Sequence, residues 1–262
     1  MPRAYATHVP VAVPLDHAID ATRTGDLWLF RGRSVADRAI QLATNSPVNH
    51  VGMAVVLDDL PPLMWHAELG RSIPDAWTGE HQRGAQLHDL RAAVTTWVHK
   101  YGQQPWFRQL DVPVTAEESQ EMEDAVLRSI ALHDGTPFPR TVRLAARWVW
   151  GHAPTAERIE RVPGVRTVRD LFRDPDARTE AEVRLERAYC AELVALSYQV
   201  MGLLSGERRA SGFDPGDFWS GGDLELLRGA RLGAEVAVDV PPAEAAQAAV
   251  APEAAQAPPS AT

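Results

Sequence analysis

Two apolar runs separated by a short polar loop constrain the fold of this chain more than any other feature. The first run, NHVGMAVVL, occupies residues 49–57, and the second, PLMWHAELG, occupies residues 62–70. Residues Asp58–Pro62 supply aspartate and proline, which are typical of turns. Two strand-length runs joined by such a loop predict a β-hairpin. A sheet that contains this hairpin is therefore the expected scaffold.

The two predicted strands place a histidine and a glutamate on one face. Side chains alternate between the faces of a strand, so His50 shares its face with Gly52. The missing side chain of Gly52 allows another segment to approach the sheet closely. If the loop closes the hairpin symmetrically, Glu68 lies opposite Gly52 and diagonal to His50, within reach of its ring. His66 then falls opposite Ala54, one step further away, so Glu68 ranks above His66 as the partner of the imidazole.

The chain contains one cysteine, Cys190, in the run RAYCAELVALSYQVMGLL. A single cysteine excludes an intrachain disulfide and any site with several thiolates. The polar residues before Cys190 give way to an apolar stretch, which predicts that Cys190 lies at the start of a buried helix. The positive end of a helix stabilises a thiolate and so favours a reactive thiol. Cys190 is thus the best nucleophile candidate, and the alternative is a small buried core residue.

Cys190, His50 and Glu68 together supply the three roles that thiol catalysis needs: a nucleophile, a base and a polar group that orients the base. They fill these roles only if the start of the helix packs against the hairpin face. The backbone amides of Cys190 and Ala191 would then stabilise an oxyanion. Tyr189 either adds a phenol to this site or packs its ring under the helix.

The segment between the hairpin and Cys190 shows mostly helical patterns, from about residue 87 to residue 186. Thr115 and Glu118 form a capping box, and apolar residues follow at helical spacing as far as Asp134. The expected organisation has three parts: an N-terminal arm at residues 1–20, a catalytic domain at residues 21–240 that contains this helical insertion, and a disordered Ala/Pro-rich tail at residues 241–262.

Four segments occur in an order that resembles a known enzyme family. They are GDLWLF, NHVGMAVVL, WHAELG and, much later, YCAELVALSYQ. Their order resembles the circularly permuted branch of the NlpC-type papain-like thiol hydrolases, which includes YiiX-like bacterial proteins and the lecithin:retinol acyltransferase family. In ordinary papain-like enzymes the cysteine helix precedes the histidine strand. Here the histidine strand comes first, as in the permuted branch.

The resemblance implies a permuted papain-like α+β fold, with an antiparallel sheet packed on the cysteine-bearing helix. Position by position, it implies Cys190 as nucleophile, His50 as general base and Glu68 as third polar residue. The acidic position matches, although its surroundings, His66 to Leu69, differ from the family pattern. The implied activity is hydrolysis or acyl transfer at an amide or ester bond through an acyl-enzyme at Cys190, without a cofactor or a metal ion.

Aromatic and basic residues indicate where a substrate would bind. The candidates for the substrate pocket are Trp28, Phe30, Asn49 and Trp65. A predicted helix further along the chain carries a basic stripe next to tryptophan, formed by Arg140, Arg143, Arg147 and Trp148. Such a stripe predicts peripheral contact with an anionic lipid surface, although the solvated face of a helix is the commoner explanation. The expected substrate is a lipid, a peptide or a small molecule with an amide bond.

Composition and the chain start exclude several other classes. The net charge of −9 and a pI of about 5.5 argue against a nucleic-acid-binding protein. The N-terminus lacks the pattern of a secretory signal, and no run is long and apolar enough for a membrane span, so a cytoplasmic location is expected. A metallohydrolase is disfavoured because no HExxH or comparable ligand pair occurs. A catalytically inactive binding module of the same fold remains the main alternative to an enzyme.

Overall fold

The computed structural model describes residues 12–32, 46–68, 72–133, 189–222 and 224–242. The strands are β1 (Ala12–Pro14), β2 (Leu27–Arg31), β3 (His50–Val55), β4 (Leu63–Glu68), β5 (Gly84–Asp89), β6 (Gln104–Arg108), β7 (Leu110–Asp111), β8 (Arg231–Leu232) and β9 (Val236–Asp239). The helices are α1 (Leu15–Asp20), α3 (Leu90–His99), α4 (Ala116–His133), the short 3₁₀ helices η2 (Ala210–Gly212) and η3 (Pro215–Phe218), and a further helix at residues 189–200.

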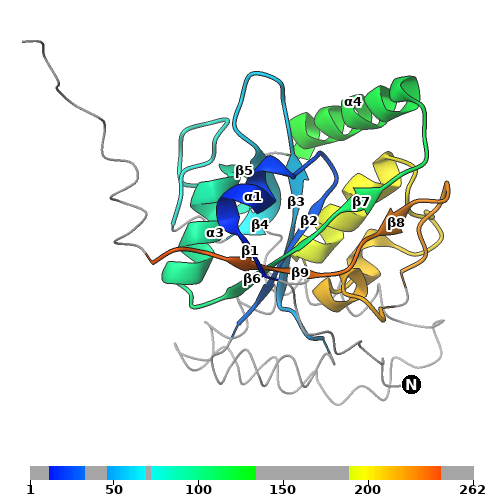
Figure 1. Cartoon of the computed structure of the whole chain (residues 1–262). Helices are drawn as coiled ribbons and strands as arrows, with labels where there is room; N and C mark the ends of the chain where they lie inside the picture. The colour runs from blue at the N-terminus through cyan, green and yellow to red at the C-terminus, as the bar shows by residue number, and fades with distance from the viewer. Residues whose placement is uncertain (1–11, 33–45, 69–71, 134–188, 223, 243–262) are drawn as a thin grey trace, which may run out of the picture.

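Seven of these strands form one sheet in the order β1-β9-β6-β2-β3-β4-β5 (Figure 1). Neighbouring strands are antiparallel except β1 and β9, which run parallel. β7 and β8 pair separately as a short ribbon. The structure therefore confirms the predicted α+β class with a mostly antiparallel sheet.

Each face of the sheet is covered by its own helices. Apolar residues of α1 and α3 pack with Trp28, Phe30 and Ala54 on one face, which we call the α3 face. Apolar residues of α4 and of helix 189–200 pack with Val51 and Met53 on the opposite face, which we call the α4 face. Because side chains alternate along a strand, the even-numbered residues of β3 belong to the α3 face and the odd-numbered ones to the α4 face.

β3 and β4 form the predicted hairpin, but their register differs from the prediction by two residues. Ala54 pairs with Met64 and not with His66. Continuing the ladder places His66 opposite Gly52, and a Cβ atom added to Gly52 would lie 3.3 Å from the Cβ atom of His66. His66 is therefore the diagonal neighbour of His50, and the same ladder places Glu68 directly opposite His50.

The register shift has a local cause at the end of β3. Val56 leaves the ladder and exchanges hydrogen bonds with Thr24: its N–H donates to Thr24 Oγ1 at 3.0 Å, and the Thr24 hydroxyl lies 3.2 Å from its carbonyl. The loop between the paired strands consequently spans residues 56–62 and is longer than the predicted one. Sequence alone gives no reason to count Val56 as a loop residue, because it continues an apolar run.

The region after residue 87 is less helical than predicted. β5 and β6 are strands, and Pro105 of β6 pairs with Phe30 of β2 inside the sheet. Proline lacks an N–H donor and normally argues against an inner strand, which is why the pattern missed β6. The predicted helix after Thr115 is confirmed as α4, and Thr115 and Glu118 form the capping box. Residues 134–188, which include the other predicted helix, lie outside the described residues.

The N-terminal segment belongs to the fold where it is described. Ala12–Pro14 extends the sheet as β1 beside β9, and Leu15 of α1 is buried on the α3 face. The predicted N-terminal arm at residues 1–20 is thus part of the packed structure from residue 12 onward. At the other end, β9 follows a segment at residues 224–229 that is not a strand.

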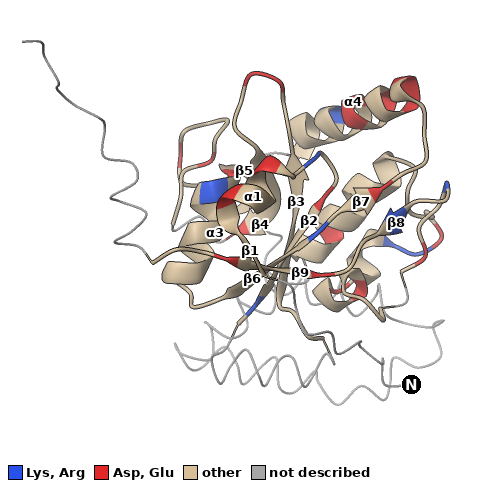
Figure 2. Ribbon diagram, viewed as in Figure 1, with Lys and Arg blue, Asp and Glu red and all other residues tan. Residues whose placement is uncertain are grey.

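Charge is concentrated outside the sheet. Acidic residues gather along α4 in Figure 2, and Glu117 and Glu118 in its first turn suit the positive end of the helix. Among the described residues, no helix has the length and apolar character that crossing a membrane requires.

Candidate functional site

Three histidines from adjacent strands form a chain of hydrogen bonds on the α3 face. His50 Nε2 lies 3.0 Å from His66 Nδ1, and His66 Nε2 lies 2.8 Å from His88 Nδ1. His88 Nε2 lies 3.1 Å from Gln86 Oε1, where the chain ends. All four side chains are buried. The rings come together because His50, His66 and His88 occupy the same face of β3, β4 and β5.

The amide of Gln86 sets the direction of these hydrogen bonds. Its Nε2 atom donates to two backbone carbonyls, so its Oε1 atom faces His88. An amide oxygen only accepts, so His88 Nε2 carries a proton. A neutral His88 then accepts at Nδ1 from His66 Nε2–H, and a neutral His66 accepts at Nδ1 from His50 Nε2–H. In a neutral His50 the basic nitrogen is therefore Nδ1.

Burial keeps the two inner histidines neutral. It lowers the pKa of His66 well below its ordinary value, and the neighbouring His88 and His50 lower it further. Burial also lowers the pKa of His88 to about 4, against the opposing attraction of Asp75. The hydrogen-bond directions derived from Gln86 thus hold at neutral pH.

The free energy of unfolding is expected to fall as the pH is lowered from 6.5 towards 4. An unfolded histidine binds a proton in this range, whereas buried His66 and His88 do not, so acid favours the unfolded state. One such histidine contributes roughly 2 kcal/mol between about pH 6.5 and about pH 5. Urea unfolding of the protein in the presence of a chelator measures this dependence.

His88→Gln should remove about one histidine's share of this pH dependence, and His99→Gln is the matched control because His99 is exposed at the end of α3. Burial raises the pKa of Glu68, so this group makes the free energy of unfolding rise as the pH falls, opposite to the histidines. Comparing variants that differ only at a histidine therefore separates the contribution of the histidine from that of Glu68. Identical pH profiles for the wild type and both variants would contradict a neutral His88.

Trp97 of α3 holds the ring of His50 in place. The two rings are stacked, with centroids 3.9 Å apart and an interplanar angle of 19°. Phe30 closes the other side of this group, with its ring centroid 5.8 Å from that of His50 and 5.2 Å from that of Trp97. The ring of His50 is therefore fixed both by stacking and by its hydrogen bond to His66.

Glu68 contacts the far end of the histidine chain. Its Oε1 atom accepts hydrogen bonds from Ser72 and from the hydroxyl of Tyr101. Its Oε2 atom lies 3.6 Å from His88 Nδ1 and has no hydrogen-bond partner among the described residues. Burial raises the pKa of Glu68 more than Ser72 lowers it. The contact with the His50 ring that was predicted for Glu68 is made by His66, the secondary candidate, because the carboxylate of Glu68 is held by Ser72 and Tyr101.

Cys190 lies in the apolar core of the α4 face. It is completely buried and packs in one cluster with Val51, Tyr189 and Ala191. Cys190 lies in the helix, which is described from residue 189 onward; the residues before 189 lie outside the described residues. Val51 follows His50 directly in β3, but the ring of His50 points to the α3 face. Cys190 and His50 thus approach the same strand from opposite faces.

The predicted pocket residues are part of the core. Trp28 and Phe30 are fully buried on the α3 face, and Trp65 is buried on the α4 face. Asn49 is also buried, and its Oδ1 accepts a hydrogen bond from the backbone N–H of Gly32 at 2.9 Å. Central strands covered by helices on both faces leave little open surface for such side chains. The predicted stripe of Arg140, Arg143, Arg147 and Trp148 lies outside the described residues.

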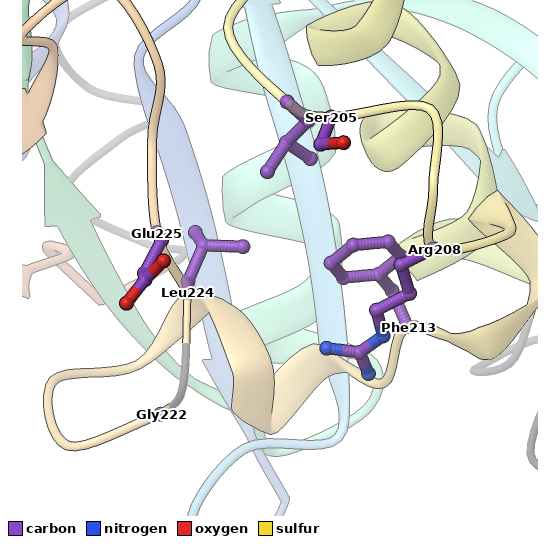
Figure 3. A pocket seen from close by; sticks show the side chains of 7 residues that line it. Ser205, Arg208, Phe213, Gly222, Leu224 and Glu225 are labelled. Atoms are coloured by element: carbon purple, nitrogen blue, oxygen red, sulfur yellow. The ribbon is translucent and has the colours of Figure 1, made fainter.

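A pocket of about 400 Å³ shares no residue with the histidine chain. It is lined by Leu204, Ser205, Arg208, Phe213, Gly222, Leu224 and Glu225 (Figure 3). The Arg208 guanidinium lies 3.9 Å from the centroid of the Phe213 ring and 2.9 Å from Asp217 Oδ2. Figure 3 shows Glu225 on the side of the pocket opposite these groups. Through its contact with Asp217, Arg208 links η3 to the loop that precedes it.

Sequence reasoning missed His88, Gln86 and Trp97. His88 and Gln86 alternate with Leu87 in β5, as His66 and Glu68 alternate with Ala67 in β4. This period of two was a usable strand pattern, but the segment was assigned to the helical region. Trp97 carries no local pattern that separates it from other core residues of α3, because its partner His50 lies far away in the sequence.

Comparison with known proteins finds similarity among solved structures only. No protein-family profile and no curated protein matches the chain. Among solved structures, the chain is similar to the crystal structure of the metalloprotein YiiX from Escherichia coli O157:H7, DUF1105. The match has 18% identity and a TM-score of 0.36, and it covers 71% of this chain and 68% of that chain. Because the TM-score is this low, the match gives no information on the site residues, ligands or reaction of this chain.

Proposed function

We propose that this chain is a cysteine-dependent hydrolase or acyltransferase with Cys190 as nucleophile and His50 as general base. The observation that carries the proposal is the hydrogen-bond chain that begins at Gln86 and leaves Nδ1 of His50 as the basic nitrogen. A thiol base needs a basic nitrogen that can take the proton and a partner that fixes the ring through the other nitrogen. The tautomer derived for His50 provides the basic nitrogen at Nδ1, with His66 as the fixing partner in place of Glu68.

The proposed reaction begins when the sulfur of Cys190 attacks the acyl carbon of an amide or ester bond and its proton passes to His50 Nδ1. His50 then gives this proton to the leaving nitrogen or oxygen as its bond to the acyl carbon breaks, which leaves a thioester on Cys190. Water or another acceptor attacks the thioester and loses a proton to His50. The acyl group is released, and the sulfur takes that proton back.

The surroundings of His50 suit a ring that becomes positively charged. Stacking on Trp97 places the imidazolium over an aromatic face, which stabilises a cation. His66 Nδ1 accepts from His50 Nε2–H in both charge states, so the ring keeps its orientation during proton transfer. No inner histidine has to change its protonation state.

The pairing of Cys190 with His50 requires an approach at the end of the strand. The two side chains belong to opposite faces of β3, but His50 is the first residue of that strand. The proposal therefore places the proton transfer between Cys190 and His50 at the end of the strand and not through the sheet. The permuted papain-like topology, in which the histidine strand precedes the cysteine helix, belongs to this proposal.

The proposed substrate is a lipid, a peptide or a small molecule with an amide or ester bond. The basic stripe formed by Arg140, Arg143, Arg147 and Trp148 favours contact with an anionic lipid surface. Reaction of the protein with fatty-acyl and with peptidyl chloromethyl ketones distinguishes the first two classes, because each probe carries the same electrophile on a different recognition group. Preferential modification of Cys190 by one of them identifies the class.

The decisive experiment measures how fast iodoacetamide modifies Cys190 in the native protein as urea is added at low concentrations. A nucleophile is expected to react at a rate that is nearly independent of urea in this range. A thiol that is only a core residue reacts through unfolding, so its rate rises steeply with urea, with the slope of the global transition. Labelling limited by global unfolding would overturn the proposal.

A catalytically inactive binding module is the second candidate, and the complete burial of Cys190 favours it. In this case the histidine chain only stabilises the sheet. Unfolding-limited labelling of Cys190, together with no modification by either chloromethyl ketone, is the result expected for such a module.

A further inference from the structure

We propose that His66, Glu68 and His88 form a binding site for a divalent transition metal ion such as Zn²⁺. One ligand atom from each residue lies within 4.8 Å of the other two. Two imidazoles and one carboxylate are a ligand set that binds Zn²⁺ and leaves one coordination position open. The three side chains are almost completely buried, on two adjacent strands that hold them in fixed positions.

The distances between the ligand atoms fit a small metal ion. Two ligands on a tetrahedral Zn²⁺ ion, each at about 2.0–2.1 Å, are roughly 3.3 Å apart. His66 Nε2 and His88 Nδ1 are 2.8 Å apart, and His88 Nδ1 and Glu68 Oε2 are 3.6 Å apart. Movements of about half an ångström bring these two pairs to the tetrahedral spacing, and the third pair, His66 and Glu68, lies within 4.8 Å.

Glu68 supplies the observation that points to a cation. Its Oε2 atom is buried and has no hydrogen-bond partner among the described residues, yet it faces His88 Nδ1. A buried carboxylate oxygen without a donor is costly, and a metal ion is the kind of partner that offsets this cost. Its other oxygen is held by Ser72 and Tyr101, so the carboxylate is already oriented for a ligand on the Oε2 side.

The site lies close to the protein surface despite its burial. The hydroxyl of Tyr101 is 3.4 Å from Glu68 Oε1, and the Tyr101 side chain is exposed. Rotation of one surface tyrosine therefore brings solvent next to the carboxylate. An ion does not have to cross the apolar core to reach it.

Metal binding would switch off the base of the proposed function, and this consequence rests on that proposal. An ion on His66 Nε2 takes the place of the proton there, so a neutral His66 carries its proton on Nδ1. His66 then donates to His50 Nε2, and the proton of His50 moves to Nδ1. His50 can no longer accept the thiol proton, so Zn²⁺ would inhibit the enzyme.

The test uses the full chain with Cys190→Ser, after treatment with a chelator and dialysis, so that the thiol cannot act as a ligand. Isothermal titration with Zn²⁺ is expected to show one bound equivalent, and Co²⁺ should give the visible absorption of a tetrahedral site. Glu68→Gln and His88→Gln, added separately, are each expected to weaken Zn²⁺ binding by about 100-fold or more. His99→Gln, which removes an exposed histidine, should bind as the parent does.

Absence of Zn²⁺ binding in the Cys190→Ser parent would overturn the metal site, as would equal affinities for the parent and Glu68→Gln. Circular dichroism checks that each variant is folded, and Glu68→Gln keeps the size and shape of the side chain if His88→Gln is unstable. The binding result does not depend on catalysis. Slower alkylation of Cys190 in the wild type on Zn²⁺ addition tests the inhibitory consequence separately.

Discussion

Replacing His50 by alanine is expected to slow the modification of Cys190 by acyl-like chloromethyl ketones by about 10²- to 10⁴-fold at neutral pH. The alanine protein lacks the nitrogen that takes the thiol proton, so only the small fraction of spontaneously ionised thiol reacts. Mass spectrometry of the labelled peptide measures the rate, and Cys190→Ser provides the blank.

His99→Ala is the matched control, because it removes an exposed histidine from the end of α3 and leaves the histidine chain intact. Its rate should equal that of the wild type. His66→Ala is expected to give an intermediate loss, since it keeps the base but removes the acceptor that fixes its tautomer. A wild-type rate in folded His50→Ala protein would show that His50 is not the base.

The hairpin of β3 and β4 could be predicted from sequence because its information is local. Two apolar runs of strand length and a loop with aspartate and proline are sufficient to place both strands. The register was wrong because it depends on Thr24, which binds both backbone groups of Val56 from outside the hairpin. A shift of two residues keeps every side chain on its face but changes its neighbours. His66 becomes diagonal to His50, whereas Glu68 comes to lie opposite His50 but directs its carboxylate to Ser72 and Tyr101.

The histidine chain illustrates the same limit across three strands. His50 and His66 could be named as candidate residues from sequence, since both lie in the strongly patterned hairpin. Gln86 and His88 lie in β5, whose pairing with β4 is not encoded in its short and polar sequence. Their place beside His66 follows from the order of strands in the sheet. The order of strands in a sheet is set by packing of the whole chain and cannot be recognised from a short stretch of sequence.

The position of Cys190 could be predicted only in part. Its location in a buried helix follows from the apolar stretch after it, and the structure agrees with this. The face of the sheet on which that helix packs was predicted wrongly, because the missing side chain of Gly52 favoured the His50 face. The helix packs on the opposite face with Val51 and Met53, and the space next to Gly52 is filled by Met64 and His66.

Replacing Trp97 by alanine is expected to lower the free energy of unfolding by about 3–5 kcal/mol, as measured by urea denaturation. The indole is 5% exposed, stacks on His50 and contacts Phe30 and Tyr101, so its loss leaves a cavity between α3 and the sheet. Trp77→Ala is the matched control: that side chain is 67% exposed, and its loss should change stability by less than about 0.5 kcal/mol. Trp97→Phe restores part of the stacking and should fall between the two. If Trp97→Ala were as stable as Trp77→Ala, α3 would not be packed on the histidine face as described, and the stacked position of His50 on which the base assignment depends would be wrong.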